Sequence, residues 1–169
     1  MNEKRELLRH FLAALAYRTQ KAVRGAPAGF AEFGAGNQIR TPKELVRHMT
    51  SVLGYARTFF LGGVYRPEQL ETFEDEIQRF HSMLEALSDH LAAGDPFLKE
   101  LTEERLLQGP FSDAMAHAGQ LALLRRLFGD PVPPENFIVA DITSANLGPT
   151  QSAPVSPDAE WPEAPKISN

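Results

Sequence analysis

The chain of 169 residues is predicted to fold as an all-α four-helix bundle with an irregular, proline-rich C-terminal tail. Three observations support this prediction. In four long stretches, apolar residues recur at intervals of three and four, which is the spacing of one helical face. No alternating apolar and polar pattern of the strand type lies between these stretches. Glycine and proline clusters separate them, and amphipathic helices of this length are typical of a bundle.

The first helix is expected over residues 3–23, and a loop of residues 24–40 follows it. Loops of that length without structure of their own often carry function or cover a site. The second helix has the clearest start signal. Thr41 can cap it, Pro42 suits the first helical position, and Glu44 completes a capping box. A pair of glycines ends this helix about five turns later.

The third helix is expected to follow Pro67, with an apolar face from Phe73 to Leu91, and the sequence Gly94-Asp95-Pro96 ends it. The fourth helix is expected to begin near Pro110 or Ser112 and to run to Phe128. Each of these helices is long enough to span a bundle and to bury one apolar face against its neighbours.

The C-terminal part of the chain differs in composition from the rest. Residues 129–169 hold eight of the thirteen prolines, and they account for the whole formal net charge of -5. Such a segment cannot continue a helix or build a core of its own. We therefore predict a bundle domain over residues 1–137 and an acidic, proline-rich tail over residues 138–169, with a short extended segment at residues 137–142.

Composition also excludes several classes of protein. A net negative charge argues against binding of nucleic acid, and the lack of cysteine excludes disulfides and thiolate metal sites. The longest uninterrupted apolar run has seven residues, whereas a membrane-spanning helix needs about twenty. No phosphate-binding loop or nucleophile elbow is present. We expect a cytoplasmic protein that acts on a small-molecule substrate.

The candidate functional residues are polar side chains on the predicted buried faces, because burial of an unpaired polar group costs free energy. His117 lies in the middle of the apolar arc of the fourth helix, and Asp113 lies one turn earlier on the same arc. His48 falls on the apolar stripe of the second helix. Two imidazoles and one carboxylate would make a metal site with open coordination positions. The structural alternatives are hydrogen-bonded core histidines and an acid that favours a helix N-terminus.

Two further residues are candidates for binding a ligand or cofactor. Tyr55 follows His48 by two turns and either presents its hydroxyl to a ligand or belongs to the core. Gln120 follows His117 by three residues and can hold either a metal ligand or a substrate in place through a hydrogen bond. The remaining histidines are expected at the surface or at the boundary of the core: His10, His81 and His90.

Two segments of the chain resemble a known family. They are TPKELVRHM, beginning at Thr41, and DAMAHAGQL, beginning at Asp113, with the sequence LLRRLFGDPVPP shortly after. Their order and spacing are similar to those of the DinB-like superfamily, which are bacterial damage-inducible proteins. The superfamily includes the YfiT-like metal hydrolases and thiol-dependent transferases. The resemblance covers roughly residues 1–137.

The resemblance implies a divalent metal in the bundle, with His48 and His117 matching two of the family's ligands. Asp113 stands at the first position of the family's His-x-x-x-His pair, where some thiol-using relatives carry a carboxylate. Zinc or nickel is the metal expected first, and manganese or iron are the alternatives. The resemblance also implies a low-molecular-weight thiol, a homodimer and a role in the stress response.

The functional prediction is a metal-dependent enzyme. A divalent metal held by His48, Asp113 and His117 activates a small thiol or water for transfer to, or hydrolysis of, a small electrophilic substrate. The sequence assigns no catalytic residue apart from these ligands. The alternative is a non-catalytic helical bundle that binds a ligand or a partner protein.

Overall fold

A computed structural model describes residues 2–98 and 100–155 and shows the predicted all-α architecture. Its four long helices are α1 (Glu3–Val23), α2 (Pro42–Leu61), α3 (Phe73–Ala93) and α5 (Ser112–Leu127). The described residues contain no β-strand. Short helical turns connect or follow the long helices: η1 (Phe30–Glu32), α4 (Glu103–Leu106), η2 (Leu107–Phe111) and η3 (Phe137–Val139).

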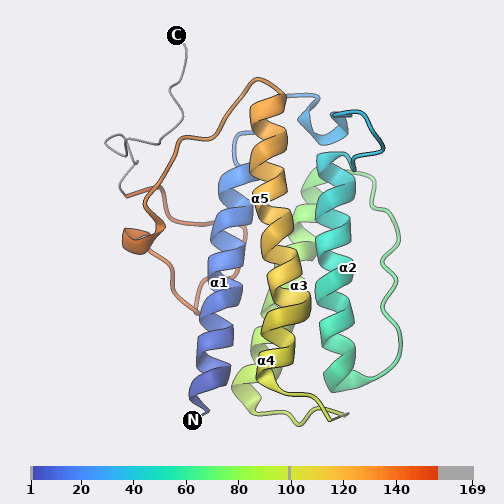
Figure 1. Cartoon of the computed structure of the whole chain (residues 1–169), viewed down its shortest axis with the longest axis vertical. Helices are drawn as coiled ribbons and strands as arrows, with labels where there is room; N and C mark the ends of the chain where they lie inside the picture. The colour runs from blue at the N-terminus through green and yellow to red at the C-terminus, as the bar shows by residue number, and fades with distance from the viewer. Residues whose placement is uncertain (1, 99, 156–169) are drawn as a thin grey trace.

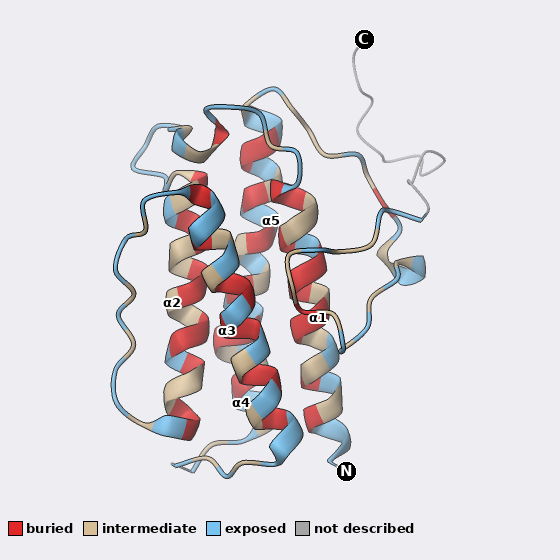
Figure 2. Cartoon of the chain, turned by 180° about the vertical axis from the view of Figure 1, so that it is seen from behind, coloured by how far each residue is buried: buried red, intermediate tan, exposed pale blue. Residues whose placement is uncertain are grey.

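The helices are arranged so that α1 and α2 each pack against both α3 and α5. Helix α2 runs antiparallel to α1, α3 runs parallel to α2, and α5 returns in the direction of α1 (Figure 1). Because α2 and α3 are parallel, the chain between them must travel the length of the bundle. Residues 62–72 form this crossover, which runs alongside α2 (Figures 1 and 2).

The starts of α1, α2, α3 and α4 are each set by a polar side chain that satisfies free backbone amides. The predicted capping box of α2 is confirmed. The backbone N–H of Thr41 donates to Glu44 Oε2 over 2.9 Å, and the backbone N–H of Glu44 donates to Thr41 Oγ1 over 3.3 Å. Asn2, Thr72 and Thr102 cap α1, α3 and α4 in the same general way.

The loop of residues 24–40 is attached to the core through aromatic rings. Phe30 is completely buried, and its ring centroid lies 5.7 Å from that of Phe128 at the end of α5. The ring of Phe33 lies 5.3 Å from the same residue. The loop therefore closes one end of the bundle before the chain enters α2, as Figure 2 shows by the buried turn at that end.

The crossover is attached to α3 by a buried ion pair. Glu76 is completely buried, pairs with Arg79, and accepts the backbone N–H of Leu70 over 2.9 Å. Arg79 in turn donates to the backbone carbonyl of Glu68 over 2.7 Å. Two crossover residues are thus held by one helix, which limits where the rest of the segment can lie.

Gly54 of α2 provides a second attachment of the crossover, because the ring of Tyr65 lies directly over it. A Cβ atom at residue 54 would come within 1.9 Å of Tyr65 Cδ1, which is far inside van der Waals contact. Only glycine leaves room for the ring at this position of the helix. The close contact between α2 and the crossover therefore depends on glycine at residue 54.

The C-terminal segment was predicted to form an acidic, proline-rich tail, and its described part packs against the bundle. Leu147 is buried in the core cluster, and the buried carboxylate of Glu135 pairs with Lys21 of α1. The extended segment predicted for residues 137–142 is wrong at its start, because residues 137–139 form the turn η3. The acidic residues of the tail beyond residue 155 lie outside the described residues.

His81 is not a surface or boundary residue, as the sequence predicted, but is 0% exposed. Its Nδ1 donates to the carbonyl of Leu147 over 2.7 Å, and its Nε2 lies 3.2 Å from Gln20 Oε1. Sequence periodicity missed its burial because the covering chain comes from a segment 66 residues away. Burial lowers the pKa of His81, and the bond to Leu147 opposes this only in part.

None of the helices in the described part of the chain is sufficiently long and apolar to cross a membrane.

Substitution of Gly54 by alanine should destabilise the fold. The new methyl group must displace Tyr65, and overpacking of this kind costs about 1–3 kcal/mol, more than the helix propensity that alanine adds. Gly119→Ala is the matched control, because nothing lies within 4 Å of its added Cβ, and it should stabilise α5 by about 0.5–1 kcal/mol. Urea denaturation measures both. Equal effects of the two substitutions would contradict the proposed contact.

The stability of the fold should fall in acid, with a contribution from His81. Its pKa in the folded state is lowered, so below a pH of about 6.5 the unfolded chain binds a proton that the folded chain resists. The free energy of unfolding should therefore decrease as the pH falls from 7.5 to 5. In His81→Gln this decrease should be smaller, whereas exposed His10→Gln should retain the full decrease. Identical pH profiles of wild type and His81→Gln would refute this assignment.

Candidate metal centre

The structure brings His48, Asp113 and His117 together between α2 and α5. One ligand atom from each residue can be chosen so that all three atoms lie within 4.8 Å of one another. Within residues 2–98 and 100–155, it is the only group of this kind that His, Asp and Glu side chains form. The predicted association of these three residues is therefore confirmed.

The distances between the three ligand atoms are close to those around a single divalent ion, although the widest would have to shorten slightly on binding. Two ligands at about 2.1 Å from a tetrahedral ion are about 3.4 Å apart, and two trans ligands of an octahedral ion are about 4.2 Å apart. Asp113 Oδ1 lies 3.5 Å from His117 Nε2. The rings of His48 and His117 meet edge to face, with 4.8 Å between their centroids.

Gln120 orients the imidazole of His117. Its Oε1 lies 2.9 Å from His117 Nδ1, and because an amide oxygen only accepts, Nδ1 carries the proton. The lone pair of the ring is then on Nε2, which is the atom that faces Asp113. Hydrogen bonds of this kind fix the tautomer of metal-binding histidines in proteins. Gln120 therefore occupies the supporting position that the sequence predicted.

The electrostatic surroundings keep His48 neutral. Its pKa is lowered chiefly by burial, and the positive charge of Arg40 and the neighbouring His117 lower it further, against the opposing effect of Asp113. A histidine must be deprotonated to bind a metal. The pKa of His48 therefore favours metal binding down to a lower pH than an ordinary histidine would allow.

Asp113 lies in a different environment from the one predicted. Its side chain is 54% exposed, whereas that of His117 is 12% exposed. The buried face of α5 is centred further round the helix, on Ala114, Ala118, Leu121, Leu124 and Arg125. Packing against α1 as well as α2 turns the helix this way, so the carboxylate lies at the solvent edge of the site. The open side of the cluster is therefore accessible.

An irregular turn precedes Asp113 and sets where α5 begins. Residues 107–111 form a π-helical turn in which Gly109 leaves helical geometry and Pro110 offers no N–H. Ser112 Oγ donates to the carbonyl of Leu107 over 2.6 Å. This bond replaces part of the helical backbone hydrogen bonding that is interrupted at the turn. Single π-helical turns are frequent at functional sites. Here the turn places Asp113 in the first turn of the new helix.

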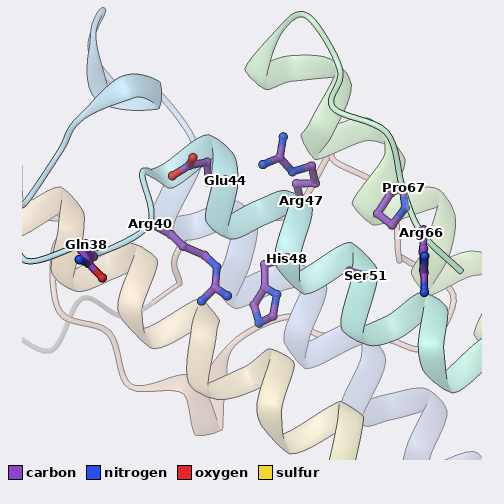
Figure 3. A pocket seen from close by; sticks show the side chains of 8 residues that line it. All are labelled: Gln38, Arg40, Glu44, Arg47, His48, Ser51, Arg66 and Pro67. Atoms are coloured by element: carbon purple, nitrogen blue, oxygen red, sulfur yellow. The ribbon is translucent and has the colours of Figure 1, made fainter.

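Two open hollows adjoin the cluster. The first has a volume of about 480 Å³ and is lined by Gln38, Arg40, Glu44, Arg47, His48, Ser51, Arg66 and Pro67 (Figure 3). The second has a volume of about 730 Å³ and is lined by Ser51, Val52, Tyr55, Gln108, Gly109, Pro110, Ser112 and Asp113. We call them the arginine hollow and the tyrosine hollow. Each contains one candidate metal ligand, and Ser51 lines both.

Tyr55 is not a core residue, because it is 59% exposed and lines the tyrosine hollow beside Asp113. Of the two alternatives that the sequence left open, the structure thus favours a position at the site. The sequence missed the arginines of the other hollow: Arg40, Arg47 and Arg66. The position of Arg47 directly before His48 was the only local signal, because the other two come from separate segments.

Comparison with protein-family models, curated proteins and solved structures found no match. The site must therefore be interpreted from its own geometry and chemistry. The DinB-like resemblance and its implied homodimer, thiol and stress-response role stay predictions.

The purified protein should bind one divalent ion per chain at this centre. In calorimetric titrations of the metal-free protein with Zn²⁺ or Ni²⁺, saturation at one equivalent is expected, and the free energy of unfolding should rise by about 2.7 kcal/mol at a free-ion concentration of 100 times Kd. His117→Ala and the exposed Asp113→Asn should each lose this binding. Gln120→Leu should retain it with affinity about 10–100 times lower.

His10→Ala is the control for nonspecific binding, because His10 is exposed and belongs to no described metal cluster. It should bind metal as the wild type does. Circular dichroism of each variant separates loss of a ligand from loss of the fold. Unchanged metal content in folded Asp113→Asn and His117→Ala would overturn the assignment of the centre.

Proposed function

We propose that this chain is a metal-dependent enzyme of the DinB-like type that transfers a small thiol to a small electrophilic substrate. The observation that carries the proposal is the convergence of two imidazoles and one carboxylate within 4.8 Å, with an open side toward solvent. Catalytic metal sites characteristically combine three protein ligands with at least one open position. Structural sites are instead closed by four protein ligands.

The residues of the chain have separate tasks in this proposal. His48, Asp113 and His117 would hold the ion, and Gln120 would keep the Nε2 lone pair of His117 directed at it. A bound divalent ion lowers the pKa of a coordinated thiol or water, so that the conjugate base is available as a nucleophile at neutral pH. Tyr55 and Asp113 would form the walls against which one reactant lies.

The two hollows favour transfer over hydrolysis. Transfer brings two organic molecules to one centre, whereas hydrolysis needs only one organic molecule and water. The arginine hollow reaches His48, the tyrosine hollow reaches Asp113, and the two meet at Ser51. Each reactant would therefore have a place of its own beside one of the candidate ligands.

An activity assay of the metal-loaded protein tests the proposal. Cysteine and glutathione serve as thiols, with chlorodinitrobenzene as a coloured electrophile, and nitrophenyl acetate without thiol measures hydrolysis. Thiol transfer above the uncatalysed rate is expected for the wild type, with a loss of at least about 100-fold in Asp113→Asn, because an activating metal contributes several kcal/mol.

His10→Ala should keep the full rate, because this exposed residue lies outside the site. Hydrolysis without thiol transfer would replace the proposed reaction by the metal-hydrolase alternative. A protein that binds one metal and turns over neither kind of substrate would be the non-catalytic ligand-binding bundle, and the enzyme proposal would fail.

A further inference from the structure

Three arginine side chains from three separate segments line the arginine hollow. Arg40 comes from the loop before α2, Arg47 from α2 itself, and Arg66 from the crossover. In Figure 3, His48 lies between Arg40 on one side and Arg66 on the other, with Arg47 above it in that view. The hollow therefore gathers positive charge immediately beside one of the candidate metal ligands.

The fold determines the backbone positions of these arginines. The chain before Arg40 contains Asn37 and Gln38 with φ angles of 49° and 60°, a left-handed conformation that is costly for residues other than glycine. The capping box at Thr41 then fixes the direction in which the chain enters α2. Arg66 directly follows Tyr65. The ring of Tyr65 can pack closely on α2 because Gly54 has no side chain at that point.

The three arginines have no acidic partner among the described residues, in contrast to the four arginines of the bundle that form ion pairs. Arg5 pairs with Glu103, and Arg125 pairs with Asp130. Among the described residues, no carboxylate lies within ion-pair distance of those in the hollow. The one acid that lines the hollow is Glu44, and its Oε2 accepts the backbone N–H of Thr41 in the capping box.

An unneutralised cluster of this kind has a preferred ligand. Like charges that line one hollow repel one another and raise the local concentration of anions. The planar guanidinium group matches the geometry of carboxylate and phosphate oxygens and binds them through paired hydrogen bonds. The volume of about 480 Å³ lies within the usual range for a small-molecule site. The net charge of -5 for the chain disfavours a polyanion such as nucleic acid.

We propose that the arginine hollow binds the oxyanion group, a carboxylate or a phosphate, of a small molecule that reacts at the neighbouring metal centre. The reaction rests on the function proposed above, whereas the binding of the anion does not. Arg40, Arg47 and Arg66 would hold the oxygens, and the remainder of the molecule would extend past His48 toward Ser51, where the two hollows meet.

Binding of two simple probes tests the proposal. Inorganic phosphate and succinate are titrated separately into the full-length protein at low ionic strength, after treatment with a chelator, and binding is followed by calorimetry. Saturable binding at one site per chain is expected for at least one probe. The tighter probe identifies whether a phosphate or a carboxylate is the group that the hollow prefers.

Exposed Arg40 and Arg66 are the residues to change, because their removal leaves the core intact. Arg40→Gln and Arg66→Gln should each weaken binding by about tenfold or more, the effect of one lost charge-assisted hydrogen bond. Arg105→Gln is the matched control, since Arg105 is exposed in α4 and lines neither hollow. It should bind the probes as the wild type does.

The outcomes separate this proposal from the enzyme proposal. Because the titrations contain no metal, a failure of metal binding or of catalysis would leave the expected result unchanged. Absence of saturable binding for both probes would overturn the oxyanion proposal. Equal weakening by Arg105→Gln would also overturn it, since binding would then follow the general surface charge. The titrations are then repeated with Zn²⁺ added. Binding that occurs only in this second set and is unchanged in Arg40→Gln and Arg66→Gln would mean that the anion is a metal ligand, which would overturn the proposal.

Discussion

The contact between α2 and α5 at His48 and His117 is the constraint on which the rest of the site depends. Their ring centroids are 4.8 Å apart, at a helix interface that apolar side chains would ordinarily fill. Two imidazolium ions at this distance would repel each other in a poorly hydrated place, and His117 indeed contributes to lowering the pKa of His48. Burial is the largest cause of this lowered pKa, and together these effects favour a neutral His48, which is the state in which a histidine can bind a metal.

The sequence predicted the parts of this site that a single helix determines. The capping box at Thr41 sets the start of α2, and the spacing from that start places His48 on the face toward α5. Asp113 and His117 are one turn apart on any helix, so their proximity also needed no tertiary information. The exposure of Asp113 was not predictable in this way. It depends on how α5 is rotated between α1 and α2, and the burial of Arg125 rotates the core face away from the carboxylate.

The parts that the sequence did not predict are those assembled from distant segments. Besides α2, the arginine hollow is formed by two segments that are distant in sequence. One is a loop with two residues in the left-handed conformation, and the other is the crossover, which is attached to Glu76 and packs on α2 at Gly54. His81 was assigned to the boundary because its own helix gives no sign of the segment that covers it. Helical periodicity describes one face of one helix, so neither arrangement produces a pattern along the chain. Such features become visible only when the tertiary contacts are known.

The charges at the site link the arginine hollow to the metal centre. A divalent ion next to three guanidinium groups would concentrate about five positive charges, whereas Asp113 supplies a single negative charge among the ligands. An anionic reactant in the hollow and a thiolate on the open side would supply the missing negative charge. Because the coupling between two binding sites is reciprocal, an anion that stabilises the bound ion is itself bound more tightly when the ion is present. Under the proposed function, the arrangement would therefore favour the complex that holds both the ion and the anion over a complex that holds only one of them.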